Sequence, residues 1–499
     1  MLKKLLCALL ASLMLIGALA SCGTVDEPAT ETNAQTQAGT VVEEETRETL
    51  DVPATRYDGK EICFLTRDES EWSTLEIFAE NQTSESDNIS NAVFERNDRI
   101  LQAYGVTITE LKKVTGEHHG ALTNEVAAPT GDFHAVVTNT SNSASFASNG
   151  FLWNLNADEI EHMDFTKSWW DTNMAEGMSI DGRLYFATGD LLTSDNDATF
   201  VIMFNKKLAK DYKDIPDLYA LVENGEWTMD ELYKYEQMAV QDNNGDGKLD
   251  YDSDICGLAY TGDVPYCMLF GGGITLCTKD EDDMPIYSLD VQRADDIAEK
   301  GKLIFSKDYT IDLNAVVNGG GITMYEAGVK TFGEGHALFM GEVMQCVTRM
   351  RGNDVDFGIL PYPKFNTQQA NYASMMHLTA SCVSIPKSVS GENLVMITSM
   401  IEAMAYHSVD TLTEQYYEIN LKTKGAKDEQ SGPMMDMILS NRVCDLSYYY
   451  QWGSNAFGQV ANCLLPTGKG VASISKKFGT LIDKNIGQLL KSLEKHEKQ

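Results

Sequence analysis

The segment from residue 242 to residue 254 carries oxygen-bearing side chains at the spacing of a calcium-binding loop. Oxygen donors occupy its first, third, fifth and ninth positions, glycine the sixth and an apolar residue the eighth. The twelfth position, which is normally acidic, is Ser253, so a one-residue bulge would be needed to bring the next aspartate to the metal. We expect one structural Ca²⁺ in this loop, with a metal-free acidic turn as the alternative. The candidate ligands are Asp242, Asn244, Asp246, Lys248, Asp250 and Asp254.

The first 22 residues form a second pattern with chemical meaning. Lys3 and Lys4 precede an apolar run from residue 5 to residue 17, and small residues lead from there to Cys22. The run is too short to span a membrane and is typical of a secretory signal peptide, here residues 1–21. A cysteine directly after the cut resembles the lipobox of bacterial lipoproteins. That resemblance implies acyl chains on Cys22 and a protein anchored at the extracellular face of the cell membrane. An ordinary signal peptide followed by a chance cysteine is the alternative.

The residues after the signal differ in composition from the rest of the chain. Residues 22–56 are rich in Thr, Ala, Gln and Glu and hold almost no large apolar side chain. Such a segment cannot bury enough surface to fold, so we expect a disordered acidic linker between the lipid anchor and the folded part.

The charge of the chain excludes one class of partner. Without residues 1–21 it carries 37 basic and 74 acidic residues. Nucleic acid requires clustered Lys and Arg, so we expect no nucleic-acid partner. Eight further cysteines are scattered without a C-x-x-C pair, which disfavours a zinc or iron–sulfur site and leaves disulfide pairing open.

The elements that must position any site alternate between strands and helices. This alternation is typical of βαβ units and of an α/β fold with a mostly parallel sheet. The clearest strands are expected at 60–66, 106–109, 133–137, 200–204 and 357–360. The clearest helices are expected at 88–104, 229–240, 294–305, 395–407 and 476–495.

Six short segments, in this order along the chain, resemble the family-1 extracellular solute-binding proteins of ABC importers. They are Asp181–Ala187, Phe204–Leu208, Trp227–Leu232, Phe332–Met340, Gly358–Pro363 and Val383–Lys387. Trp169-Trp170-Asp171 and the later Gly189-Asp190 resemble the longer lipoprotein members found in clostridia.

The resemblance implies an α/β fold of the two-lobed periplasmic-binding-protein type (type II), with a hinge and an interlobe cleft. The chain would cross between the lobes near Asp195–Thr199, near Pro361 and near His407–Gln415. Lobe one would then comprise residues 57–196 and 362–410, and lobe two residues 197–361 and 411–499. A ligand would lie in the cleft, at the carboxyl ends of the strands.

The resemblance also implies which residues contact the ligand. Proteins recognise sugars by packing aromatic rings against the C–H faces and by hydrogen-bonding the hydroxyls with amides and carboxylates, and the candidates are of these types. The same residue types also make ordinary turns and core, which is the alternative for each of them. In lobe one and at the first crossing the candidates are Asn139, Asn142, Trp169, Trp170, Asp195 and Asp197. In lobe two they are Tyr266, Glu342, Tyr449 and Trp452.

The function that the resemblance implies is capture of a small-molecule solute, a mono- or oligosaccharide, by a monomer that delivers it to an ABC permease. No catalysis is expected, because the chain has no H-E-x-x-H, no G-x-S-x-G and no phosphate loop. Two alternatives remain. A cell-surface adhesion or scaffold protein would account for the calcium-like loop, and a surface glycosidase would use two of the many carboxylates.

Overall fold

The computed structural model describes residues 48–68, 76–80, 88–417 and 430–497. The predicted signal peptide, Cys22 and most of the predicted linker lie outside these residues. Residues 48–56, at the end of that linker, contact the folded part: Leu50 and Val52 pack against its core, and Glu48 accepts a hydrogen bond from the Ser168 N–H (2.8 Å). Within the described ranges, no helix is both long enough and apolar enough to cross a membrane.

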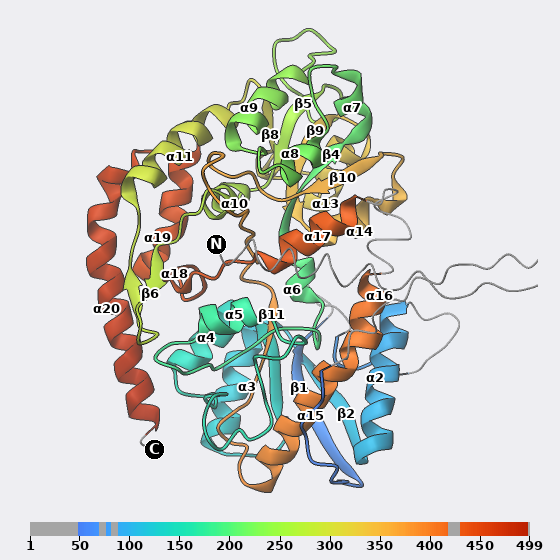
Figure 1. Cartoon of the computed structure of the whole chain (residues 1–499), viewed down its shortest axis with the longest axis vertical. Coiled ribbons are helices and arrows are strands. Elements are labelled where there is room, and N and C mark those ends of the chain that lie inside the picture. The colour runs from blue at the N-terminus through green and yellow to red at the C-terminus, as the bar shows by residue number, and fades with distance from the viewer. Residues whose placement is uncertain (1–47, 69–75, 81–87, 418–429, 498–499) are drawn as a thin grey trace, which may run out of the picture. The chain divides into compact units, whose positions relative to one another are not determined.

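A four-stranded sheet organises the first lobe (Figure 1). Its order is β11 (Ser381–Ser384), β3 (Ala135–Asn139), β1 (Lys60–Arg67) and β2 (Val106–Lys113). β1 is parallel to both of its neighbours, whereas β11 runs antiparallel to β3. The last six residues of β1 are all buried, as expected of a strand covered on both faces.

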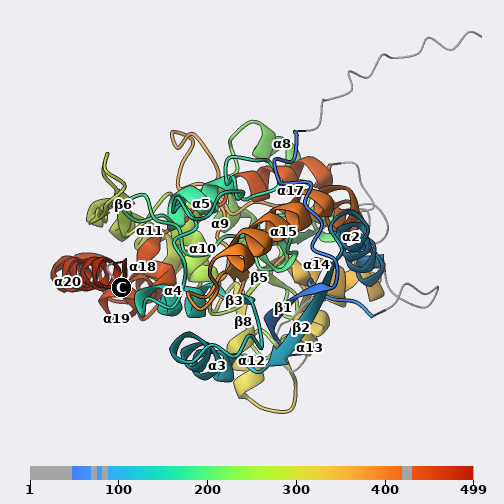
Figure 2. The same cartoon turned by 90° about the horizontal axis from the view of Figure 1, so that it is seen from below.

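Helices from distant parts of the sequence cover this sheet. α2 and α15 lie side by side in both views (Figures 1 and 2), although all five strands of the second-lobe sheet lie between them in the sequence. α2 buries one stripe at helical spacing, including Val93, Arg96 and Ile100. The helices of this lobe are α2 (Asn88–Tyr104), α3 (Thr115–Ala127), α4 (Thr140–Ser148), α5 (Thr172–Met178) and α15 (Glu392–Ser408).

A five-stranded mixed sheet organises the second lobe. Its order is β10 (Phe357–Leu360), β4 (Phe200–Asn205), β9 (Ala337–Val343), β5 (Cys256–Tyr260) and β8 (Thr310–Asp312). β5 is parallel to β9 and β8, whereas β4 is antiparallel to β9 and β10. Its helices are α7 (Lys206–Asp211), α8 (Leu218–Glu223), α9 (Met229–Met238), α10 (Val264–Gly271), α11 (Val291–Ile304), α12 (Leu313–Asn318), α13 (Met324–Gly328), α14 (Gln345–Arg349) and α17 (Ser431–Ser440).

The chain passes between the two sheets more than once. The short helix α6 (Ser194–Asp197) leads from the first sheet into β4, and residues 361–380 lead from β10 back to β11. After α15, the π-helical turn Val409–Thr413 and α16 (Glu414–Tyr417) precede α17, which packs on β10.

The C-terminal region touches both lobes. It consists of α18 (Leu446–Tyr449), α19 (Trp452–Ala461) and the long α20 (Val471–Glu497). α20 packs against α19 and α11, and near its end the Ser492 hydroxyl donates to the Ser148 carbonyl of the first lobe (2.7 Å). The hairpin of β6 (Cys277–Lys279) and β7 (Pro285–Tyr287) also reaches the first lobe, where Asp283 accepts from the Gly182 N–H (2.9 Å).

Candidate functional site

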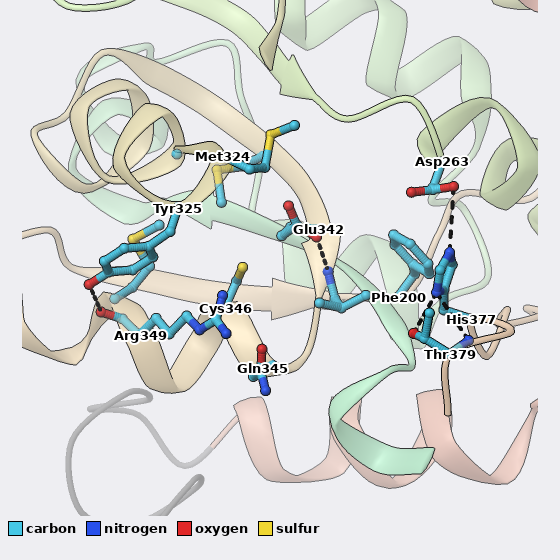
Figure 3. A pocket seen from close by; sticks show the side chains of 14 residues that line it. Phe200, Asp263, Met324, Tyr325, Glu342, Gln345, Cys346, Arg349, His377 and Thr379 are labelled. Atoms are coloured by element: carbon cyan, nitrogen blue, oxygen red, sulfur yellow. Dashed lines mark hydrogen bonds and ion pairs between the residues drawn. The ribbon is translucent and has the colours of Figure 1, made fainter. Parts of the chain in front are cut away.

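A cavity of about 500 Å³ lies where β5 and β9 end and where the chain approaches β11 (Figure 3). The second lobe supplies most of its wall, from the end of β9, from α13 and α14 and from the residue before α10. His377 and Thr379, just before β11, supply the rest. Because β5 and β9 are parallel, their carboxyl ends meet at one edge of the sheet, which is where open α/β sheets bind ligands.

Glu342, a predicted contact, lies in the middle of this wall. It is the second-to-last residue of β9, and its carboxylate accepts a hydrogen bond from the Val343 N–H (2.9 Å). Burial raises the pKa of the Glu342 carboxyl to about 7, while that hydrogen bond and the charge of Arg349 act in the opposite direction. Near neutral pH this carboxyl can therefore exchange between accepting and donating hydrogen bonds to a ligand.

Gly341 allows the start of α10 to approach this strand. A Cβ on Gly341 would come within 2.8 Å of both the Tyr362 hydroxyl and Cγ2 of Val264. The missing side chain therefore brings the N-terminus of α10, with Asp263, close to the end of β9. Asp263 and Glu342 thus line the same cavity.

At one end of the cavity, Asp263 faces His377. His377 Nε2 lies 3.7 Å from the Asp263 carboxylate, and His377 Nδ1 is 2.7 Å from the Thr379 hydroxyl. The backbone N–H of His377 donates to the Ala198 carbonyl (2.9 Å), which holds His377 next to the first crossing. The pair connects the second lobe with the segment that enters the first.

At the other end, Tyr325 and Arg349 lie together (Figure 3). The Arg349 guanidinium is 5.6 Å from the centre of the Tyr325 ring, within cation–π range, and the Tyr325 hydroxyl donates to the Arg349 carbonyl (3.3 Å). Tyr325 is 42% exposed. It stands on α13, whose N-terminus is fixed by a reciprocal cap between Thr323 and Glu326.

The predicted contacts on the first lobe have structural roles. Asn139 caps α4 by accepting from the Asn142 N–H (2.7 Å), and the Asn142 amide faces the Thr115 carbonyl (3.4 Å). Trp169 and Trp170 are both buried, and their indole N–H groups donate to the two oxygens of Glu402 (2.9 Å each). The expectation that one indole is core and the other a stacking platform is wrong for this structure, because the shared carboxylate holds both inside.

Asp195 and Asp197 lie on α6, which leads from the first sheet into β4, and both side chains are buried. Arg442 contacts Asp171 (2.9 Å) and Asp195 (3.1 Å), and Asp197 accepts from the Tyr416 hydroxyl (3.0 Å). Burial raises the pKa of Asp195 to about 6 and that of Asp197 to about 7, and Arg442 opposes the rise at Asp195. We call Asp171, Asp195 and Arg442 the hinge triad.

The hinge triad ties the crossings to each other. The backbone of Arg442 bridges that of Ser374 in the second crossing, while its side chain reaches α6 in the first. Its partners leave little of the guanidinium accessible, since the Arg442 side chain is 8% exposed. The crossing acids therefore fix the hinge and do not face the cavity.

The three aromatic candidates of the second lobe pack against other protein groups. Tyr266 stacks on Phe457 (6.0 Å between ring centres, 10° between planes). Tyr449 is fully buried and its hydroxyl donates to the Met376 carbonyl (2.9 Å), and Trp452 packs against Tyr450. None of the three lines the cavity around Glu342.

Sequence reasoning missed most of the cavity. Asp263, Tyr325, Arg349 and His377 carry no motif, and all four lie in short connecting or helical segments of ordinary composition. A signal was present for Asp263, because it lies three residues after the end of β5, and open α/β sheets bind ligands at the carboxyl ends of their strands. For Tyr325 and Arg349, which the fold brings together from α13 and α14, the sequence offered none.

The calcium-like loop has a turn structure that fits the donor set in part. Asp242 accepts from the N–H groups of Gly245 and Gly247 (2.6 and 2.9 Å), and Gly247 has a positive φ of 79°. Asp254 is buried and accepts from the Asn243 and Asp250 N–H groups. Across the described residues, no three His, Cys, Asp or Glu side chains gather closely enough to hold a metal ion. The exposed carboxylates would have to turn inward around a cation.

No protein-family model matches the chain, and no curated protein does. Solved structures resemble it along most of its length. The maltose/maltodextrin-binding domain MalE from Bdellovibrio bacteriovorus, bound to maltotriose, has a TM-score of 0.51 at 14% identity, covering 86% of this chain and 100% of its own.

Two further solved structures give the same picture. The GacH receptor of Streptomyces glaucescens, solved unliganded and with acarbose, has a TM-score of 0.51 at 15% identity over 86% of this chain and 98% of its own. An ABC substrate-binding protein from Listeria monocytogenes, in complex with cycloalternan, has a TM-score of 0.51 at 11% identity over 86% of this chain and 100% of its own. The chain therefore has the two-lobed α/β fold of the ABC-importer solute-binding proteins, as its motif series predicted.

Proposed function

We propose that this protein is a lipid-anchored extracellular solute-binding protein, which captures a mono- or oligosaccharide in the cavity around Glu342 and delivers it to an ABC permease. Binding needs no covalent chemistry. The two lobes would close over the solute, and the permease would recognise the closed form.

The cavity is the observation that carries this proposal. It lies at the carboxyl ends of β5 and β9, and the segment entering the first lobe completes its wall, so lobe movement would change its width. Its size falls within the usual range for small-molecule sites. Carboxylates and an amide supply partners for hydroxyls, and Tyr325 supplies an aromatic surface. The similar structures with maltotriose, acarbose and cycloalternan support the class of solute.

The test is a thermal-unfolding screen of the purified full chain against neutral and acidic sugars, with amino acids and peptides as a second panel. A solute at 100 times its Kd stabilises the folded state by about 2.7 kcal/mol, which gives a clear rise in Tm. We expect one sugar class to give that rise. The rise should shrink in Glu342→Ala and persist in Lys207→Gln, which changes an exposed residue outside the cavity.

Three results would count against the proposal. A rise in Tm with amino acids or peptides alone would exclude a sugar as the solute. An equal rise in the Glu342→Ala variant would place the solute elsewhere. No response to any solute would favour the alternative of a surface adhesion or scaffold protein.

The lipid anchor rests on Cys22 and has its own test. In a bacterial host that processes lipoproteins, we expect the wild-type chain in the membrane fraction and the Cys22→Ser variant released or uncleaved. Mass spectrometry of the mature N-terminus would detect the acyl chains. Equal release of both chains would support an ordinary signal peptide.

We further propose that the 242–254 loop binds one structural Ca²⁺. The exposed oxygens of Asp242, Asn244 and Asp246 and the turn at Gly247 support this proposal. Calcium should raise the Tm relative to EDTA in the wild type and not in Asp246→Asn, with Mg²⁺ as the control cation. An identical Tm in calcium and in EDTA would leave the acidic turn as the correct interpretation.

A further inference from the structure

Arg349 differs from the other arginines in its hydrogen bonding. Of the eight arginines whose side chains the structure describes, seven donate to a carboxylate, a carbonyl, an amide or a hydroxyl oxygen. Those seven are Arg56, Arg67, Arg96, Arg99, Arg183, Arg293 and Arg442. Arg349 donates no hydrogen bond and forms no ion pair with any described residue, although the chain carries a net charge of −35. Its guanidinium therefore has five donors available in the candidate cavity.

The neighbours of Arg349 hold it in place without neutralising it. Its guanidinium lies over the Tyr325 ring, and the Tyr325 hydroxyl bonds its backbone carbonyl. Glu342 is near enough for the Arg349 charge to lower its pKa, yet the two form no ion pair. Asp263 lies at the opposite end of the cavity beside His377, with Glu342 between the two ends (Figure 3).

We propose that Arg349 and Tyr325 form a subsite for a sugar ring that bears a carboxylate, a hexuronate unit. This inference rests on the proposed function and narrows its solute class. The planar guanidinium matches a carboxylate through two parallel hydrogen bonds, whereas a neutral sugar offers it only hydroxyls. The exposed Tyr325 ring provides a surface for the C–H face of the same sugar.

The remaining polar groups divide the cavity into an acid-binding end and a hydroxyl-binding end. Asp263, and Glu342 when it is ionised, would repel a carboxylate that lay beside them, so the solute has one favoured orientation. Its carboxylate points to Arg349, and its hydroxyls point to Glu342 and to the His377–Thr379 end. The Gln345 amide, on the first turn of α14, also lines the cavity and can donate to the carboxylate of the solute or accept from its hydroxyls.

The experiment compares matched pairs of sugars on the full chain by calorimetry and thermal unfolding. D-glucuronate and D-galacturonate are paired with glucose and galactose, and with the uronate methyl esters, which keep the ring and remove the charge. Disaccharides of each class extend the comparison. We expect the uronates to bind roughly 10- to 100-fold more tightly than their neutral partners, the size of a charge-assisted hydrogen-bonded pair. Added salt should weaken the binding of the uronates only.

Three variants locate the preference. Arg349→Gln should remove the preference for uronates. Arg349→Lys should keep part of it, because the positive charge remains but the two parallel hydrogen bonds of a guanidinium are lost. Tyr325→Ala should weaken the binding of both sugar classes. Lys207→Gln removes one positive charge outside the cavity and should change nothing. The unliganded Tm of each variant separates a loss of binding from a loss of folding.

The outcomes separate this inference from the proposed function. Equal binding of neutral sugars and uronates overturns the inference and leaves the solute-binding function standing. A uronate preference that survives in Arg349→Gln overturns the assignment to Arg349. No binding of any sugar overturns both. Loss of the preference in Arg349→Gln, with neutral sugars unaffected, supports the inference.

Discussion

Arg349 and Arg442 show the same side chain in two opposite environments. Arg442 is buried in the hinge triad, where two carboxylates lie 2.9 and 3.1 Å away. Arg349 is exposed in the cavity, over a tyrosine ring and without a carboxylate partner among the residues that the structure describes. A charge taken out of water requires partners, whereas a charge left in a water-filled cavity does not.

The difference indicates what each region is built to do. At the crossings between the lobes, the ion pairs of the hinge triad hold together the three chain segments that carry Asp171, Asp195 and Arg442. The cavity keeps charge accessible at the ends of strands that the fold has already positioned. Stability and recognition are therefore separated in this molecule, and substitutions should affect one without the other.

The largest effect should come from Arg442→Met. Removing the guanidinium leaves Asp171 and Asp195 buried without a cation, and breaking a buried pair in this way costs about 3–5 kcal/mol. Urea unfolding followed by circular dichroism measures the loss. The double variant Arg442→Met/Asp195→Asn should recover part of the lost stability, because only one buried carboxylate is then left without a cation. A loss below about 1 kcal/mol would show that the crossings do not depend on the triad.

A pH effect of intermediate size should come from the acids around the triad. Burial raises the pKa of Asp190 and of Asp197 from 3.8 to about 7 in the folded chain. The folded state then binds these protons more tightly than the unfolded state, so their stabilising effect is complete below pH 4 and is lost as pH rises through 7.

The Asp190→Asn variant measures this contribution. The amide oxygen can still accept from the Thr413 hydroxyl, which lies 2.8 Å from Asp190, but it does not titrate. We expect the fall in unfolding free energy between pH 4 and pH 8 to be smaller in the variant by on the order of 2–4 kcal/mol. Parallel pH curves for variant and wild type would contradict the raised pKa.

The smallest effect on stability should come from Arg349→Gln. Because this guanidinium loses no hydrogen-bonded partner in the described part of the chain, the free energy of unfolding should change by no more than about 0.5 kcal/mol, as for ordinary surface substitutions. Urea unfolding under the conditions used for Arg442→Met gives a direct comparison. A loss similar to that of Arg442→Met would remove the contrast between the two regions.

The sequence predicted the fold better than it predicted the site. Strand β4 and helices α2 and α15 were expected within three residues of their observed bounds, because long apolar periodicities depend on local pattern alone. Strand 133–137 lies two residues later, at 135–139, because the chain joins the sheet only after Phe133, which the core buries. Glu342, two residues after the Phe332–Met340 motif, lies in the wall of the cavity, and its contact with a ligand stays a prediction.

The errors at the site have a common physical cause. Trp169, Tyr449 and Trp452 are residue types that suit both a sugar platform and a core, and only their burial decides between the two. For the paired indoles and for Tyr449 the decisive partner was distant in the sequence, namely Glu402 and the Met376 carbonyl. Sequence spacing gives no information about such contacts.

The placement of β11 has a consequence for how the chain folds. β11 pairs with β3, yet the strands of the whole five-stranded sheet come before it in the sequence. The edge of β3 stays open until residue 384 is available to pair with it, so the sheet that begins first is completed last. An open edge in a slowly completed sheet can pair with another chain. In the interval before β11 pairs with it, the open edge of β3 is therefore a point at which aggregation can start.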